Sequence, residues 1–531
     1  MKIINQKILA KNCFDEVTNP REIYEYSPKG LIGIAHSFRA QWSGRNIELQ
    51  KELLSIYKTE TIDFVAQIEL KYKINDIDFH SNKNLIIIAT GSYDGGCYYE
   101  GELILWDYKE NITTKIIKNN REFTQCKFED DNLRITVNPI HDLDCEDDEN
   151  EKNIDDCKDE IYLFKYEEKE EIELSDLIAV SITEHTNDFD IKQYNRHKKE
   201  IIVRLNQLAE RIGKKYEGNK HVWDIAFINS NKLAIALSDA KIQIIEVDSD
   251  KSTTIILPVE GNATQIFFND STNKLIVNIF PHQFSYKKEK NKFYEIDINT
   301  LKHRKIFEGS FSLSKTNLNE FLARQTDYLG NEKYDIIFDT HFNEKVKLEL
   351  GHYDLFNHYI RIDNANNFYA FIGNPKNQHK NKRLIEIDKN FKINTIIEIE
   401  KEPVMYNNLV GYLINDIFVF SGKNYSISYN YEVFAYKKKK KNSFFSNKKE
   451  LWKFGLSGQV TAVTKLNNIK NIIILTTTTR EILVIDILAG KIIYNLTTLS
   501  LLNGYPLSIA SIDNKIAIGY ENGLIEIVEI E

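Results

Sequence analysis

One short pattern recurs along this chain of 531 residues: a few apolar, β-forming residues followed by an acidic residue. Six copies, "LILWD", "IIEVD", "YEID", "DIIFD", "LIEID" and "ILVID", end at Asp107, Asp248, Asp297, Asp339, Asp388 and Asp486, and a weaker copy ends at Glu529. Successive copies from Asp248 to Asp388 lie 49, 42 and 49 residues apart. A period of about 40–50 residues is typical of the four-stranded blades of β-propellers.

Each repeat unit also has the same internal plan. Between His221 and Leu257, four apolar, β-rich stretches are separated by short polar turns: "VWDIAFI", "KLAIAL", "KIQIIEV" and "STTIIL". The last full unit repeats this plan with "VTAVTKL", "NIIILTTT", "EILVIDI" and "KIIYNLT". Asn, Asp, Ser and Gly dominate the turns, as β-hairpins require. The sequence therefore predicts a predominantly antiparallel all-β fold.

The stretches "GSYDGG…ELILWD", "HVWDIAF…ALSDAKIQIIEVD" and "IAIGYENGLIEIVEI" resemble blades of WD40-type β-propellers. A blade of that family carries Gly-His at its start, a Ser-x-Asp-Gly turn between its second and third strands, and Trp-Asp at the end of the third. His221 stands at the first of these positions, Asp94 and Asp239 at the turn, and Trp106 with Asp107 at the last. The resemblance implies a WD40-like β-propeller of four-stranded antiparallel blades.

The repeat pattern divides the chain into ten units. Their third strands are expected to end near Tyr57, Asp107, Tyr166, Asp248, Asp297, Asp339, Asp388, Tyr436, Asp486 and Glu529. The final unit has only three strands of its own, so we expect "KIINQKILA" at the N-terminus to supply the fourth and to close the ring. The expected organisation is a closing strand in 1–12, first blades in 13–174, a helical insertion in 175–218 and further blades in 219–531. One large ring is favoured, and two rings remain open.

The segment 175–218 has helical periodicity. The stretch "RHKKEIIVRLNQLAERIGKKY" places Ile201, Ile202, Leu205, Leu208 and Ile212 on one face and charged residues on the other. Such an amphipathic helix either packs on the side of a blade or forms an arm that docks on a partner.

Two segments between strands carry charge of a single sign. Residues 141–160 hold eleven carboxylates with His141, Cys145 and Cys157. They form either a metal-binding loop or a solvated one; the run of charge favours the solvated loop, and a Cys spacing of twelve fits no zinc motif. The other segment is a run of lysines tipped by two aromatic residues: Lys437, Lys438, Lys439, Lys440, Lys441, Phe444 and Phe445. It is either a hairpin kept soluble by charge or a contact for an anionic membrane, a nucleic acid or a partner protein.

The hairpin "GSYDGGCYYEGELILWD" is about six residues longer than an ordinary blade turn. Its tip carries Tyr93, Asp94, Tyr98 and Tyr99, and tyrosine is enriched at interaction hot spots. These side chains either contact a partner or pack on the adjacent blade, and we take them with the lysine segment as candidate partner-binding residues.

Composition limits the classes of function. A net charge of −9 argues against general nucleic-acid binding. We find no signal-peptide pattern and no apolar stretch long enough to span a bilayer. Five scattered cysteines are typical of a reduced protein, so we expect a cytoplasmic location.

Motifs for catalysis are not recognisable in the sequence. It has no phosphate-binding loop, no dinucleotide glycine pattern, no GxSxG and no HExxH, so we expect no cofactor, no metal and no enzymatic activity. The favoured hypothesis is a non-catalytic protein–protein interaction scaffold or recognition subunit of an intracellular, bacterial multi-protein complex, with other proteins as partners. The alternative is a propeller enzyme or small-ligand sensor with a site over the central channel.

Overall fold

The structure is a computed structural model. It describes residues 3–39, 50–93, 99–117, 121–138, 158–166, 171–184, 191–216, 218, 220–281, 290–325, 334–350, 365–372, 382–399, 407–424, 430–437, 450–497, 500–502 and 504–531. The chain divides into two compact units. Unit 1 comprises Met1–Lys11, Arg39–Leu49 and Lys220–Glu531, and unit 2 comprises Asn12–Phe38 and Gln50–Asn219.

Unit 1 contains, in its described part, seven antiparallel sheets, six of four strands and one of three. The first three sheets are β16 (Val222–Asn229) to β19 (Ser252–Ile256) with β17 (Lys232–Leu237) and β18 (Lys241–Glu246); β20 (Asn262–Asn269) to β23 (His303–Gly309) with β21 (Lys274–Phe280) and β22 (Asn291–Asp297); and β24 (Phe311–Lys315) to β27 (Glu344–Leu348) with β25 (Phe321–Gln325) and β26 (Asp335–Phe338). The next three are β28 (Phe368–Ile372) to β30 (Ile393–Ile399) with β29 (Lys382–Ile387); β31 (Asn407–Ile414) to β34 (Glu450–Leu456) with β32 (Ile417–Asn424) and β33 (Asn430–Lys437); and β35 (Val460–Lys465) to β38 (Lys491–Asn495) with β36 (Ile472–Thr477) and β37 (Ile482–Asp486). The seventh joins β39 (Pro506–Ile512), β40 (Lys515–Tyr520) and β41 (Ile525–Ile530) to β1 (Ile3–Leu9).

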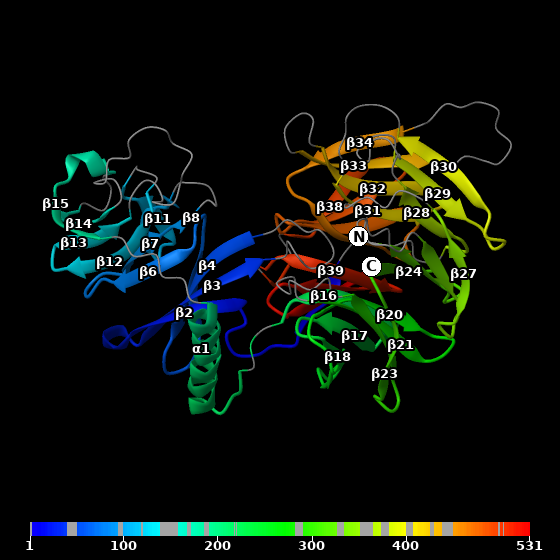
Figure 1. Cartoon of the computed structure of the whole chain (residues 1–531), viewed down its shortest axis with the longest axis horizontal. Helices are drawn as coiled ribbons and strands as arrows, with labels where there is room; N and C mark the ends of the chain where they lie inside the picture. The colour runs from blue at the N-terminus through cyan, green and yellow to red at the C-terminus, as the bar shows by residue number, and fades with distance from the viewer. Residues whose placement is uncertain are drawn as a thin grey trace. The chain divides into compact units, whose positions relative to one another are not determined.

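The seven sheets of unit 1 close on one another as the blades of a ring. A separate apolar cluster fills each of the six interfaces between consecutive sheets. A seventh cluster packs Ala510 and Ile527 of the last sheet against Ile225 of the first. Figure 1 shows these sheets succeeding one another from green β16 to red β39, with β39 beside β16. Seven interfaces for seven sheets define a closed, seven-bladed propeller.

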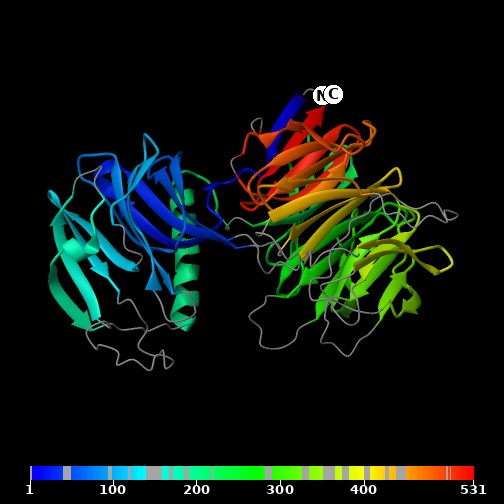
Figure 2. The same cartoon turned by 90° about the horizontal axis from the view of Figure 1, so that it is seen from above.

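The N-terminal strand β1 completes the last blade. It pairs antiparallel with β41, from Ile3 opposite Ile530 to Leu9 opposite Ile525, and the blue strand lies beside the red one in Figure 2. The Lys7 ammonium then reaches the neighbouring blade and donates to the carbonyl oxygen of Val247 at 2.8 Å. The predicted closure by an N-terminal strand is confirmed.

The middle strands of the blades explain why the sequence reads as continuous apolar runs. Each of β17, β21 and β36 is sandwiched between two other strands within its sheet and between two neighbouring blades outside it. All six residues of β36, "IIILTT", are therefore buried, whereas all five residues of the outer strand β38, "KIIYN", are exposed. Strands buried on both faces lose the usual alternation of apolar and polar residues.

Side chains near the start of the innermost strands link successive blades. Asp224 Oδ2 accepts a hydrogen bond from the backbone N–H of Ile266, at 3.0 Å, in the next blade. Gln265 Oε1 does the same for the N–H of Leu313, at 2.9 Å. Both acceptors follow a register shift in their own strand. After the register shift, the Asp224 and Gln265 side chains reach the next blade, where each satisfies a buried backbone donor.

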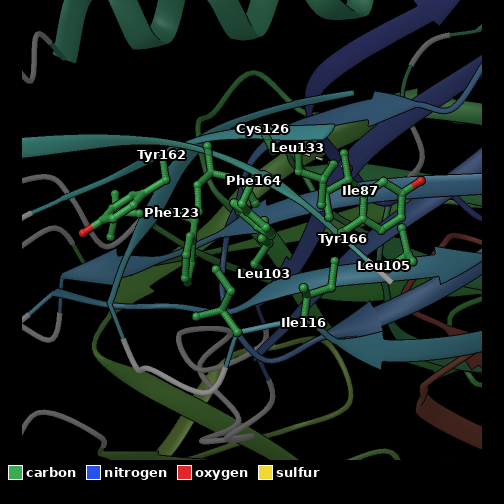
Figure 3. Close-up of a cluster of buried hydrophobic side chains, with 14 of the residues drawn as sticks. Ile87, Leu103, Leu105, Ile116, Phe123, Cys126, Leu133, Tyr162, Phe164 and Tyr166 are labelled. Atoms are coloured by element: carbon green, nitrogen blue, oxygen red, sulfur yellow. Dashed lines mark hydrogen bonds between the residues drawn. The ribbon is translucent and has the colours of Figure 1, made fainter. Parts of the chain in front are cut away.

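Unit 2 contains three four-stranded sheets in its described part. They are β2 (Asn19–Tyr26), β3 (Leu31–Arg39), β4 (Gln50–Lys58) and β5 (Phe64–Leu70); β6 (Ile74–Phe79), β7 (Leu85–Thr90), β10 (Leu103–Asp107) and β11 (Ile112–Lys115); and β12 (Phe123–Glu129), β13 (Asn132–Val137), β14 (Lys158–Lys165) and β15 (Ala179–Glu184). One apolar cluster joins the first sheet to the second, and another joins the second to the third. Figure 3 shows the latter cluster, with Ile87 and Leu103 of the second sheet beside Phe123 and Phe164 of the third.

Helix α1 (Ile191–Arg211) packs on the first sheet of unit 2. Ile201, Leu205 and Leu208 are buried against Ile34 of β3 and Tyr57 of β4. Of the two interpretations of the amphipathic helix, packing against a blade is therefore the one that the structure shows. No helix in the described ranges is long and apolar enough to cross a membrane.

The fold class predicted from the sequence is confirmed: an all-β, WD40-like propeller of four-stranded antiparallel blades with one helical insertion. Nine of the ten expected third-strand ends lie in, or within two residues of, the third strand of a four-stranded sheet. The other, Asp388, directly follows β29, the middle strand of the three-stranded sheet. The sequence favoured one large ring, whereas seven sheets close on one another in unit 1 and three are stacked in unit 2. The exact domain limits, including the 12/13, 174/175 and 218/219 boundaries, stay a prediction.

Candidate functional site

The candidate residues predicted from the sequence belong to both units. Tyr93 and Tyr99 lie opposite each other in a two-stranded ribbon of unit 2, formed by β8 (Ser92–Tyr93) and β9 (Tyr99–Glu100). Lys437 is the exposed last residue of β33 in unit 1. Outside the described residues lie Asp94, Tyr98, Lys438, Lys439, Lys440, Lys441, Phe444 and Phe445, together with 141–157 of the acidic loop. The role of these residues in binding stays a prediction.

The ring of unit 1 has two ends with different chemistry. The innermost strands β16, β35 and β39 run in the same direction, so that their N-terminal ends meet at one end of the ring and their C-terminal ends at the other. We call the first of these ends the Arg480 rim and define it by His221, Asp239, Arg480, Tyr505 and Glu521. These residues come from inter-blade connections and from the turns between second and third strands.

Arg480 is held on the ring of Tyr505. Its guanidinium carbon lies 4.3 Å from the centre of the aromatic ring, and Nη2 donates a hydrogen bond to the phenol oxygen at 2.8 Å. Arg480 has φ +66° and ends the turn that begins at Thr477. Stacking and hydrogen bonding together fix the direction of a long cationic side chain that would otherwise sample many rotamers.

A buried hydrogen-bond network holds the Arg480–Tyr505 pair in place. The Glu521 carboxylate is 5% exposed and accepts a hydrogen bond from the backbone N–H of Tyr505, while the N–H of Glu521 donates to the Tyr505 carbonyl at 3.1 Å. The His221 ring contacts the carbonyl of Glu521 through Nδ1 and lies edge-on to Trp223, 5.2 Å between ring centres. The rim is therefore rigid across the last blade and the first.

The turn at Asp239 extends the rim along the first blade. Asp239 and Ala240 have φ of 56° and 50°, as expected for the two central residues of a type I′ hairpin turn. The exposed Asp239 carboxylate forms an ion pair with Lys220, 2.5 Å between Nζ and Oδ2. Asp239 is one of the residues that the sequence placed at a WD40-type turn.

The opposite end of the ring opens into a cavity of about 380 Å³. It is lined by residues from six of the seven innermost strands and from the turns that follow them. The described lining contains one carboxylate, Asp270, and two lysines, Lys315 and Lys465. A single carboxylate without a histidine partner does not form the acid–base pair that hydrolytic chemistry uses. Within the described ranges, three or more metal-binding side chains nowhere gather as a metal site would require.

No family model matches the sequence, and no curated protein matches it. Among solved structures, the chain is similar to the WD40 β-propeller domain of Doa1, with 13% sequence identity, a TM-score of 0.42, and coverage of 59% of this chain and 95% of that chain. The strand topology, the ring of seven blades and the closing strand define a WD40-like β-propeller.

Sequence reasoning placed two residues of the Arg480 rim, His221 and Asp239, at WD40-type positions and missed Arg480, Tyr505 and Glu521. Arg480 follows the run "TTTT", which the strand pattern explains by β-propensity alone, and Tyr505 and Glu521 lie in connections without a motif. One signal was available: the turn that holds Arg480 occupies the same place between second and third strands as the Asp94 and Asp239 turns. Turns at this place in successive blades face the same end of a ring, so they can be grouped from the repeat alone.

Proposed function

We propose that this chain is a non-catalytic protein–protein interaction scaffold or recognition subunit of an intracellular, bacterial multi-protein complex. The proposed contact surface is the Arg480 rim. The observation that carries the proposal is the stacking of Arg480 on Tyr505, supported by the buried Glu521 network. Arg and Tyr are enriched at binding hot spots.

The rigidity of the rim supports a role in binding. Docking on a surface whose side chains are already ordered costs little additional conformational entropy. The rim also combines one fixed cation, Arg480, with an exposed anion, Asp239, which favours a partner surface that carries both charges. Lys437 and the β8–β9 ribbon with Tyr93 and Tyr99 stay further candidate contacts.

The proposal is tested by identifying a partner and then measuring its affinity. Proteins that co-purify with the tagged full chain from its native cells are identified by mass spectrometry, and the dissociation constant of each purified partner is measured. We expect Arg480→Ala to weaken binding at least about tenfold, as for an interface hot spot. Arg211→Ala, at the exposed end of α1, is the matched control and is expected to leave the affinity unchanged.

Two results would contradict the proposal. One is the recovery of no stable partner from native cells while the purified chain hydrolyses esters or glycosides in a metal-dependent way, which would favour the enzyme alternative. The other is a partner that binds the parent chain and Arg480→Ala equally well, which would remove the Arg480 rim from the interface.

A further inference from the structure

The cavity opposite the Arg480 rim has both apolar and polar lining residues. Phe227 of β16, Tyr412 of β31 and Ile509 of β39 supply apolar surface. Its volume of about 380 Å³ is at the lower end of the range of small-ligand pockets. A cavity of this size accepts one or two side chains of an extended segment and excludes a helix or a sheet.

Two charged side chains of the lining, Asp270 and Lys315, are hydrogen-bonded within the fold. The Asn319 amide donates to the Asp270 carboxylate and, at 2.8 Å, to the hydroxyl of Ser271. The Lys315 ammonium donates to the Asn319 amide oxygen at 3.0 Å and to the carbonyl of Phe268 at 2.7 Å. Asn319 therefore bridges the anion and the cation, and both charges have partners within the fold.

Lys465, the second lysine of the lining, has different surroundings. The hydroxyls of Thr464 and Ser511 are hydrogen-bonded to each other at 2.9 Å, and Ser511 also donates to the carbonyl of Lys465. Lys465 itself is half-buried, and its Nζ has no hydrogen-bond or ion-pair partner among the residues that the structure describes. A partly desolvated ammonium without a counter-charge favours the binding of an anion beside it.

We propose that this cavity binds a glutamate side chain from an extended acidic segment of a partner protein, with the carboxylate paired to Lys465. This proposal rests on the proposed interaction function and adds a second contact at the other end of the ring. The apolar lining residues suit the two methylene groups of glutamate, and the Lys465 ammonium is the donor to its carboxylate. Lys437 is exposed at the end of β33 on the same side of the ring, since β33 runs parallel to β31, and it adds positive charge toward the edge of that face.

The test uses a fluorescein-labelled hexaglutamate peptide as the probe and the full-length chain as the receptor. We expect fluorescence anisotropy to show saturable binding that weakens at least about tenfold in Lys465→Glu, because a like charge then faces the carboxylate. Lys470→Glu, an exposed lysine in the turn after the same strand, is the matched control and is expected to retain binding. Lys465→Gln keeps the side chain's polarity and shows whether loss of the positive charge alone weakens binding, and thermal unfolding verifies that each variant is folded.

Each other outcome has a defined meaning. No binding of hexaglutamate at about 1 mM, or equal loss in the Lys465 and Lys470 variants, would overturn the proposal, the second by assigning the attraction to general surface charge. Competition by free glutamate as effective as that by the peptide would assign the site to a small carboxylate instead of a protein segment. Arg480→Ala leaves hexaglutamate binding unchanged if the two ends act independently, so failure here and failure of the Arg480 rim are distinguishable.

Discussion

The phenol of Tyr520 donates a hydrogen bond to Oε2 of Glu526 at 2.7 Å, in the core of the blade that β1 completes. Glu526 is fully buried, and its carboxylate also accepts hydrogen bonds from the Ser500 hydroxyl at 2.7 Å, the backbone N–H of Leu501 at 2.8 Å and the amide of Gln6 in β1. Burial raises the pKa of Tyr520 well above its usual range, with the adjacent Glu526 charge as a second cause, so the phenol stays protonated and donates. One carboxylate thus ties the closing strand to its blade.

Glu526→Gln tests this closure. The amide nitrogen of the glutamine would face donors in place of an acceptor, and we expect the free energy of unfolding of unit 1 to fall by about 1–3 kcal/mol. Urea denaturation followed by hydrogen exchange of β1 peptides measures the effect. Gln6→Ala removes only one of the donors and is expected to have a smaller effect; an equal effect of the two variants would contradict a central role for the carboxylate.

Asp224→Ala and Asp76→Ala test the links between blades in separate units. Asp76 Oδ2 accepts from the N–H of Cys126 at 3.0 Å in unit 2, as Asp224 does from Ile266 in unit 1. Because each substitution leaves a backbone donor unsatisfied, we expect a loss of about 1–3 kcal/mol in the affected unit only. Hydrogen-exchange mass spectrometry reports each unit separately, and faster exchange in both units from one substitution would show that the units do not unfold independently.

His36 gives unit 2 a pH-dependent stability. It is fully buried, its Nε2 lies 2.8 Å from the Ser55 hydroxyl, and desolvation, with nearby Arg21 as a second cause, lowers its pKa from 6.5 to about 3. Between these values the unfolded chain binds a proton that the folded chain does not. The contribution of His36 to the free energy of unfolding of unit 2 is therefore fully present above about pH 6.5. It falls with decreasing pH by at most about 1.4 kcal/mol per pH unit.

The measurement for His36 is urea denaturation across this pH range, in the parent chain and in His36→Gln. The slope should be flatter in the variant, which cannot take up the proton. The carboxyls of Asp76 and Asp78 act in the opposite direction, because burial raises their pKa, and they are common to both chains. Equal slopes in parent and variant would contradict the assignment to His36.

Gly101→Ala tests the backbone at the base of the β8–β9 ribbon. A Cβ at this position would overlap the carbonyl oxygen of Thr90 and would lie 2.9 Å from that of Arg121. Because both neighbours are backbone atoms, we expect a loss of about 2 kcal/mol or more and local opening of the ribbon. Gly455→Ala is the matched control: its Cβ would have a single neighbour, the carbonyl oxygen of Tyr431 at 3.9 Å, and little change is expected. Tm values compare the two, and a similar loss in both would contradict the steric reason.

The blades could be predicted from the sequence because burial of each middle strand between neighbouring blades requires a local run of apolar residues. The runs "LIIIAT" and "IIILTT" become β7 and β36. The acidic residues that end third strands, such as Asp297 and Asp486, accept hydrogen bonds from backbone N–H groups of the turns that follow. No local sequence pattern indicates how many blades each unit contains. It depends on which blade packs against which, and the cluster that joins Leu9, Ile225 and Ile527 brings together residues from three distant parts of the chain.

The candidate site was less accessible from the sequence for the same reason. Arg480 and Tyr505 belong to no sequence motif, and their arrangement with His221, which stands at a WD40-type position, exists only after the last blade has packed on the first. The ammonium of Lys465, which has no ion-pair partner among the described residues, was equally hidden, because "TKLNN" reads as the end of a strand. Charge runs such as 437–441 attract notice in a sequence, whereas isolated charges in a ring become visible only in three dimensions.

The pairing of β1 with β41 has a consequence for the synthesis of the protein. Gln6 and Glu526, which contact each other across this pair, are 520 residues apart in the chain. At ribosomal rates of about 5–20 residues per second, β1 waits roughly half a minute to nearly two minutes before its partner strand emerges. During that interval its backbone edge is open to other nascent chains, and the whole of unit 2 is translated before the first complete blade of the ring. Ring closure therefore waits until β41 has been synthesised, and chaperones have time to influence it.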